Sequence, residues 1–436
     1  MTKKLELLMP AGNFEKMKYA IAYGADAVYA GVPMFSLRAR ENQFTWESLE
    51  EAVKYCHDRG KKIYFTANIY AHNMKIKPFM ASFAKMQAMK PDAYIMSDPG
   101  LISLVREAYP DAEVHLSVQA NNTNWAQVKF WQKIGVKRII LSRELALREI
   151  REIHEQAPNM ELEFFVHGSI CMAYSGRCLL SNYFSGRDPN QGTCAHSCRW
   201  EYKVFRKDAD EDALYDVTGR PEDYQPLKGE FYLEEQDRKG EMLPIDEDEY
   251  GTYIMNSRDM CLLGYLKELK EAGVISFKVE GRSKTVNYLA GVGRAYRAGL
   301  DAIERDEIYD EEVLAREIFA ISNRGYTPGF LVGDPGAKGI YFAKNKEFKE
   351  EEYLGMIREY DSERKLARLE VKNRFDLNDE VIVVSPEARR TQIITTILDP
   401  NNEPKTEAHG GNFDVWINMD EPVSEYALLR KKIIED

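Results

Sequence analysis

Short apolar runs alternate with helical patterns over the first three hundred residues of the chain. Eight runs rich in β-branched and aromatic residues recur, namely LELLMPAG, DAVYAG, KIYFTANIY, DAYIMSD, EVHLSVQA, RIILSRE, LEFFVHG and SFKVEG. Most are separated by stretches such as WESLEEAVKYCHDRG, whose apolar residues three and four positions apart are typical of helices. Eight strands, each followed by a helix or a long connection, predict a TIM-like (β/α)8 barrel over residues 1–310 in preference to a doubly wound open sheet.

The regular alternation stops after the seventh strand. An insertion over about 169–250 contains a group of cysteines and then an acidic, turn-rich stretch, which predicts a surface excursion or a partly disordered loop. A connecting segment over 311–347 leads to a second unit at 348–436. There, short alternating runs broken by Asn, Asp and Pro predict a small antiparallel β-barrel domain.

Composition and charge limit the function classes. The chain of 436 residues is 44% hydrophobic and 30% charged, which is typical of a soluble globular protein. A formal net charge of −12 argues against a surface that binds nucleic acid everywhere, but it leaves room for a local basic patch. We find no signal peptide and no apolar window long enough for a membrane span, so we expect no membrane contact and a location in the cytoplasm.

Four of the six cysteines lie between positions 171 and 198, with the spacing C-x6-C-x15-C-x3-C. In a reducing compartment such clusters more often serve metal or redox chemistry than disulfides. Structural zinc sites favour two close pairs, whereas iron–sulfur clusters tolerate more varied spacing. Burial as a small apolar residue fits Cys56, but not the thiols in the polar stretch DPNQGTCAHSCRW. A single nucleophile assisted by His167 would not account for four cysteines. The pattern therefore favours metal, iron–sulfur ahead of zinc, with Cys261 as a further candidate ligand.

Polar residues also follow the predicted strands, where the chemistry of a barrel gathers. These residues are Asn13, Asn68, Asp98, Gln119, Arg143, His167 and Glu280. Strand ends are often polar simply because they meet solvent, so this pattern alone does not define a site.

The segments FFVHGSICMAYSGRCLLSNYF and RDPNQGTCAHSCRWEY resemble the signature of the collagenase-like "peptidase" family of unassigned catalytic type. The segments PAGNFEKMKYAIAYGADAVYAG, MNSRDMCLLGYLKEL and FKVEGRSKTVNYL extend this resemblance over nearly the whole chain. Within the family, the stretch from MSDPGLISL to RIILSREL is similar to the prephenate-dependent tRNA uridine hydroxylation proteins.

This resemblance implies hydroxylation of the wobble uridine of tRNA to 5-hydroxyuridine, with a 4Fe–4S cluster as cofactor and prephenate as co-substrate. It implies that the cluster ligands are Cys171, Cys178, Cys194 and Cys198. Relatives that modify other substrates take a ligand from the position of Cys261, so either Cys198 or Cys261 is the fourth ligand. Exposed clusters are often lost in air, which leaves empty thiols, a disulfide or adventitious zinc.

A small dicarboxylate such as prephenate is best bound by arginines that pair with it through two hydrogen bonds. We therefore expect catalytic roles for Arg143, His167 and Arg282, and substrate binding by Arg38, Arg40, Asn68, Gln119 and Lys278. For tRNA we expect basic contacts from Lys278, Arg282, Lys284, Arg430, Lys431 and Lys432, with the C-terminal domain as an RNA-contacting accessory by analogy.

Two other functions stay open at this point. The family label suggests a peptidase, and Ser169 lies two residues from His167, although the chain has no HExxH helix and no GxSxG elbow. The third reading is a non-enzymatic RNA-binding or assembly factor whose metal site is structural.

Overall fold

The computed structural model describes residues 4–37, 42–171, 173–185, 187–191, 194–195, 197–199, 205–207, 224–226, 231–234, 242–247, 252–253, 257–339, 348–411 and 414–433. None of the helices in these ranges is long and apolar enough to cross a membrane.

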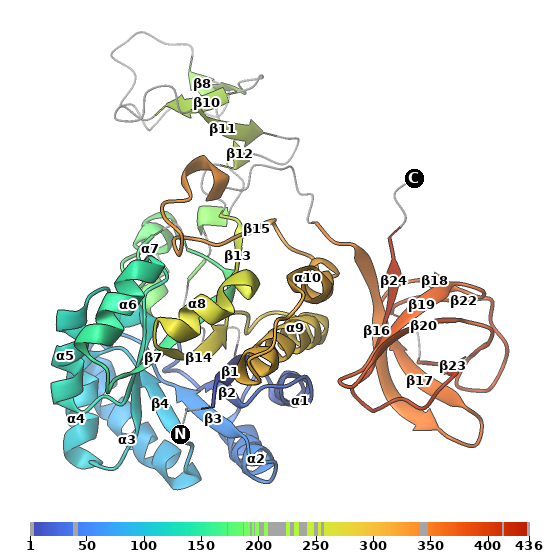
Figure 1. The fold of residues 1–436 in the computed structure, drawn as a ribbon, viewed down its shortest axis with the longest axis horizontal. Helices are drawn as coiled ribbons and strands as arrows, with labels where there is room; N and C mark the ends of the chain where they lie inside the picture. Colours follow the sequence, from blue (N-terminus) through green and yellow to red (C-terminus); the bar gives the residue numbers. More distant parts are fainter. Residues whose placement is uncertain are drawn as a thin grey trace.

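A closed barrel of eight parallel strands forms the larger part of the molecule (Figure 1). In sheet order these are β1 (Glu6–Ala11), β2 (Ala27–Gly31), β3 (Lys62–Thr66), β4 (Ala93–Met96), β5 (Val114–Leu116), β6 (Arg138–Ile140), β7 (Glu161–Ser169) and β14 (Val274–Val279). Strand β14 pairs in parallel with both β1 and β7, which closes the barrel. All eight predicted strands, and the barrel that they predict, are confirmed.

Helices connect the strands and cover the outside of the barrel (Figure 1). They are α1 (Phe14–Ala22), α2 (Trp46–His57), α3 (Asn73–Met89), α4 (Pro99–Ala108), α5 (Trp125–Ile134), α6 (Leu147–Gln156), α8 (Leu266–Glu271), α9 (Val286–Glu304) and α10 (Glu311–Phe319). Polar side chains cap several first turns, as where Asn13 accepts from the Lys16 amide and Asp98 accepts from the Gly100 amide. Capping therefore explains why Asn13 and Asp98 stand directly after β1 and β4.

The insertion after β7 includes α7 (Leu180–Ser185) and the short strands β8 (Phe205–Lys207), β9 (Tyr224–Pro226), β10 (Phe231–Glu234), β11 (Met242–Glu247) and β12 (Thr252–Tyr253). Much of the predicted acidic excursion lies outside the described residues. The chain then returns to the barrel through β13 (Asp259–Cys261), which pairs antiparallel with β7 and parallel with β15 (Tyr326–Thr327).

A curled antiparallel sheet forms the C-terminal domain, as the sequence predicts. Its order is β20 (Arg389–Ile393), β19 (Glu380–Val384), β24 (Leu428–Lys432), β16 (Glu351–Asp361), β17 (Leu366–Val371), β23 (Val415–Asn418) and β21 (Ile397–Leu398), with β18 (Phe375–Asp376) pairing to β22 (Glu407–Ala408). The domain has its own apolar core, separate from that of the barrel.

The C-terminal domain packs on the side of the barrel that carries α1 and α9 (Figure 1). The hydroxyl of Tyr23 donates a hydrogen bond shared between the carbonyl oxygens of Val384 and Tyr426, each 2.9 Å away. An apolar cluster of residues from both domains surrounds this contact. The two domains are therefore joined by a packed interface.

The prediction that Arg430 contacts RNA is wrong. Its side chain is fully buried in the domain interface, and its Nε donates a 2.7 Å hydrogen bond to Oδ1 of Asn287 on α9. Its guanidinium also lies 3.4 Å from Glu317 and 3.5 Å from Glu351. Arg430 therefore links the C-terminal domain to the barrel, and its removal would leave Glu317 and Glu351 with less positive charge beside them.

Candidate functional site

A cavity of about 380 Å³ lies at the C-terminal ends of the barrel strands. Residues that follow β2, β3, β5, β6, β7 and β14 form its floor and walls, and the first part of the insertion forms its mouth. The cavity therefore occupies the end of the barrel at which substrates of such folds bind.

Most of the predicted site residues line this one cavity. They are Asn68, Gln119, Arg143, Lys278 and Arg282 from the barrel, and Cys171, Cys178, Cys194 and Cys198 from the insertion. Arg38 and Arg40 lie outside the described residues. His167 is not among the residues that line the cavity.

The cysteines of the insertion share the cavity, whereas Cys261 does not. No disulfide joins any of the six cysteines, all of which fall within the described ranges. Cys261 on β13 pairs with His167 across the sheet, and its sulfur lies 3.6 Å from the hydroxyl of Tyr296. Burial raises the pKa of the Cys261 thiol. Cys56, predicted to be a buried apolar residue, is buried in α2, as expected.

The donor set fits a four-thiolate cluster in kind and number, since four cysteine side chains border one space. Within the described ranges, no three Cys, His, Asp or Glu side chains already converge on a common point. The four thiols therefore border one cavity without already forming a ligand set.

A tight contact fixes the loop between Cys171 and Cys178. Gly176 has a φ of +74°, and a Cβ at this position would lie 2.0 Å from the carbonyl oxygen of Gln119. Only glycine fits this close approach with a left-handed backbone. The amide of Ser175 also donates a 2.6 Å hydrogen bond to Glu144. The loop is thus held over the barrel at the mouth of the cavity.

The two arginines of the cavity are held by protein groups. Nη1 of Arg143 donates a 2.5 Å hydrogen bond to the carbonyl oxygen of Ser169, and its Nη2 lies 4.0 Å from the sulfur of Cys171. Nη1 of Arg282 donates a 2.7 Å hydrogen bond to the hydroxyl of Ser36. Both cations of the cavity are therefore held in place by protein groups, and Arg143 lies beside Cys171.

The amides of Asn68 and Gln119 have protein partners. Oδ1 of Asn68 accepts from the Leu37 amide, and its Nδ2 donates to the Ser117 hydroxyl. The side chain of Gln119 donates a 2.7 Å hydrogen bond to Asn190 of the insertion. These two residues hold the wall of the cavity in shape.

His167 and Ser169 do not form a nucleophile and base pair. The buried ring of His167 has its Nδ1 at 3.3 Å from the hydroxyl of Tyr296, while its Nε2 has no hydrogen-bond partner in the described part of the chain. Burial lowers the pKa of His167 to about 3, so the ring is neutral. The hydroxyl of Ser169 instead contacts Asp259 at 3.3 Å and Arg324 at 3.2 Å.

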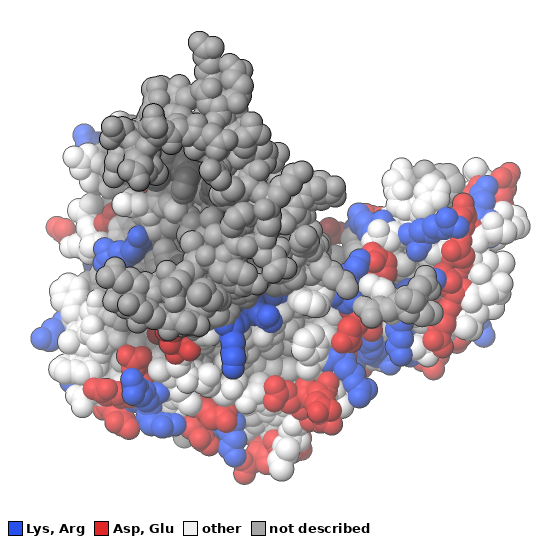
Figure 2. Space-filling model, turned by 90° about the horizontal axis from the view of Figure 1, so that it is seen from above, with Lys and Arg blue, Asp and Glu red and all other residues white. Residues whose placement is uncertain are grey.

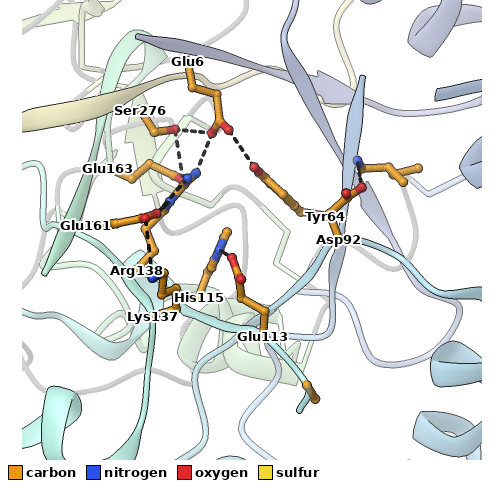
Figure 3. Close-up of polar contacts among 12 residues, drawn as sticks. Glu6, Tyr64, Asp92, Glu113, His115, Lys137, Arg138, Glu161, Glu163 and Ser276 are labelled. Carbon is orange, nitrogen blue, oxygen red and sulfur yellow. Dashed lines mark hydrogen bonds and ion pairs between the residues drawn. The ribbon is translucent and has the colours of Figure 1, made fainter. Parts of the chain in front are cut away.

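Sequence reasoning missed a network of buried charges inside the barrel, below the cavity (Figure 3). Arg138 lies 2.5 Å from Glu6, 3.1 Å from Glu161 and 3.3 Å from Glu163. Lys278 lies 2.8 Å from the other oxygen of Glu163. The signal that could have revealed the network is a charged residue in the middle of an apolar strand, because such a residue is rarely buried without a partner.

Basic and acidic side chains are interspersed over the described part of the face seen in Figure 2, on the barrel and on the C-terminal domain alike. Lys278 and Arg282, predicted to contact tRNA, are buried in the cavity. Their position suits a small anion better than a phosphate backbone.

Fold and site together define the class of protein. It is a (β/α)8 barrel with a cysteine-lined cavity at the C-terminal ends of its strands and an antiparallel β domain docked on its side. Among known families, Peptidase family U32 matches residues 12–341, and the Peptidase family U32 C-terminal domain matches residues 349–430. The chain therefore belongs to peptidase family U32, which confirms the predicted resemblance.

Individual relatives have different names. The chain is 42% identical to a tRNA hydroxylation protein P of Escherichia coli, over 98% of this chain and 97% of that protein. It is 32% identical to a 23S rRNA 5-hydroxycytidine synthase of the same species, over 78% of this chain and 47% of the relative. A collagenase of Porphyromonas gingivalis is 28% identical, with 87% of this chain and 86% of the collagenase covered.

Proposed function

We propose that this protein is an RNA-modifying enzyme that hydroxylates the wobble uridine of tRNA to 5-hydroxyuridine. The names of two relatives describe hydroxylation of RNA, and one of them is similar along almost its whole length. The observation that carries the proposal is that four cysteines and three buried or anchored cations border one cavity at the C-terminal end of the barrel.

In this proposal, a 4Fe–4S cluster is held by Cys171, Cys178, Cys194 and Cys198, with Cys198 favoured over Cys261 because it shares the cavity. When bound, the cluster supplies the redox chemistry that side chains lack. Prephenate is the proposed co-substrate.

The cations of the cavity are proposed to bind the co-substrate. Arg143, Lys278 and Arg282 bind and orient the two carboxylates of the co-substrate, since charge-assisted hydrogen bonds to carboxylates are strong and directional. The walls around them are apolar, with Phe165 and Ile140 among the lining residues, so water is largely excluded once the cavity is filled. His167 instead contacts Tyr296, whose hydroxyl links Val166 to Leu262, and it is given no contact with the co-substrate because it does not line the cavity.

The peptidase hypothesis relied on Ser169 and His167 acting together. The structure does not support it, because the Ser169 hydroxyl contacts Asp259 and Arg324 and not His167. A third reading, a non-enzymatic factor with a structural metal, predicts that Cys171→Ala unfolds the protein as well as stopping modification.

The test is to purify the chain without oxygen, quantify iron, sulfide and zinc, and measure 5-hydroxyuridine in tRNA incubated with prephenate. We expect about four irons with matching sulfide per chain. Cys198→Ala is expected to lose iron and product, while Cys261→Ala and the buried control Cys56→Ala keep both. One zinc without sulfide would overturn the proposal, and loss of iron in Cys261→Ala but not in Cys198→Ala would exchange the fourth ligand.

A further inference from the structure

Three carboxylates inside the barrel, those of Glu6, Glu161 and Glu163, share the guanidinium of Arg138 (Figure 3). Arg138 directs Nη1 to Glu6 at 2.5 Å, and it uses both Nε and Nη2, each at 3.1 Å, on one oxygen of Glu161. Its remaining contact with Glu163 is long, at 3.3 Å. Glu163 is therefore the carboxylate that Arg138 neutralises least.

Lys278 is the close cationic partner of Glu163. Its Nζ donates a 2.8 Å hydrogen bond to Oε1 of Glu163, whose side chain is fully buried. A buried carboxylate with too little positive charge beside it is unfavourable, and Arg138 gives Glu163 only a long contact, so this geometry favours the ammonium form of Lys278. Burial lowers the pKa of Lys278, and the positive charges of Arg138 and Arg282 lower it further, whereas the negative charge of Glu163 opposes these effects.

The ammonium keeps donor capacity for a ligand. It has three N–H groups, and Glu163 is its one hydrogen-bond acceptor in the described ranges. Its other close neighbours are the aromatic rings of Tyr29 at 4.5 Å and Phe165 at 5.3 Å. All three residues, Lys278, Tyr29 and Phe165, line the cavity that also contains the cysteines.

We infer that Glu163 is a positioning residue, which keeps Lys278 charged and directed at the cavity floor so that Lys278 binds a carboxylate of the co-substrate. This inference rests on the proposed function for the identity of the ligand. Glu163 does not line the cavity and acts only through Lys278, from which it accepts a hydrogen bond. The remaining side of the ammonium faces the cavity, where an anionic group completes its hydrogen bonds.

The experiment compares Glu163→Gln with the matched control Glu161→Gln, which removes a carboxylate two residues earlier on the same strand. The first readout is the titration of Lys278 in protein labelled with ¹³C-lysine, assigned by the signal missing in Lys278→Met. The second is KM for prephenate against kcat. We expect Glu163→Gln to lower the pKa of Lys278. We also expect it to raise KM for prephenate about tenfold, which corresponds to the loss of one charge-assisted hydrogen bond, while kcat stays near wild type. Glu161→Gln is expected to shift both readouts less than Glu163→Gln, because Glu161 contacts Arg138 and not Lys278.

The double variant E163Q/K278M keeps the test usable if Glu163→Gln alone fails to fold, because it buries neither charge. Its KM is expected to equal that of Lys278→Met, and a wild-type KM would overturn the inference. An unchanged titration of Lys278 in Glu163→Gln would overturn it as well. A wild-type enzyme that forms no 5-hydroxyuridine from prephenate would instead overturn the proposed function, while a shifted titration would still support the role of Glu163 in charging Lys278.

Discussion

Replacing Arg430 with methionine should undock the C-terminal domain from the barrel. The guanidinium is fully buried between α9, α10 and β16, where it contacts Asn287, Glu317 and Glu351. Methionine has a similar length and no charge, so it leaves two buried carboxylates behind without creating a large cavity.

The expected loss of stability depends on how much positive charge stays beside Glu317 and Glu351. Removing one partner of a buried ion pair costs about 3–5 kcal/mol. Arg389 lies 3.3 Å from Glu317 and also pairs with Glu351, so both keep a cation. We therefore expect the lower end of the range, about 3 kcal/mol of lost stability in Arg430→Met.

Lys431→Met is the matched control, because neighbouring residues on a strand point to opposite faces. Lys431 lies 2.7 Å from Asp379 and is about a third exposed, so its loss should cost no more than about 1 kcal/mol. Urea unfolding gives the stabilities, and hydrogen exchange of peptides from α9 and β24 reports on undocking. Equal unfolding midpoints for the two variants would refute the reasoning. Weaker tRNA binding by fully folded Arg430→Met would restore the original RNA prediction.

Two further predictions concern the barrel. The pKa of His167 is lowered by burial from 6.5 to about 3, so the unfolded chain binds the proton more tightly, and stability falls as the pH drops below about 6.5. At about pH 5 this loss is about 2 kcal/mol, and His167→Gln should abolish it; a variant that loses stability with pH as steeply as wild type would contradict this. Tyr174 is 64% exposed and lines the cavity. Under the proposed function we expect its ring to stack on a base of the tRNA, so Tyr174→Ala should raise KM for tRNA about tenfold and Tyr174→Phe should restore it. Equal KM values for the two Tyr174 variants would argue against stacking.

Periodicity was enough to predict the barrel, because each strand is an apolar run and each helix repeats apolar residues at spacings of three and four. Closure then brings residues far apart in sequence to one end of the fold, which is why Arg143, Lys278 and the cysteine segment share a cavity. Cys261 shows the limit of spacing arguments. It follows the insertion closely in sequence, but the ladder between β13 and β7 holds it away from that cavity.

The two surprises both come from the direction of a side chain on its strand. LLRKK looks like a basic patch, yet alternation turns Arg430 into the domain interface and Lys431 outward. Lys278 is predicted to bind substrate, but nothing in LEFFVHG indicates that Glu163 also points into the barrel and meets it there. Which face of a strand is inside depends on the pairing of the closed sheet, and a local pattern does not contain that information.

The cost of buried charge supports a functional reason for the network under the cavity. Apolar residues of similar volume fill a barrel at least as stably as a buried ion pair, since desolvation of the charges offsets much of their attraction. Stability alone therefore does not explain why Glu163 and Lys278 occupy the barrel below a cavity lined by Phe165 and Ile140. A need for a fixed positive charge at the cavity floor does explain it, because a lone buried lysine would lose its proton. If the pair serves binding of the proposed co-substrate, E163Q/K278M should unfold at a urea concentration no lower than wild type while its KM for prephenate stays raised.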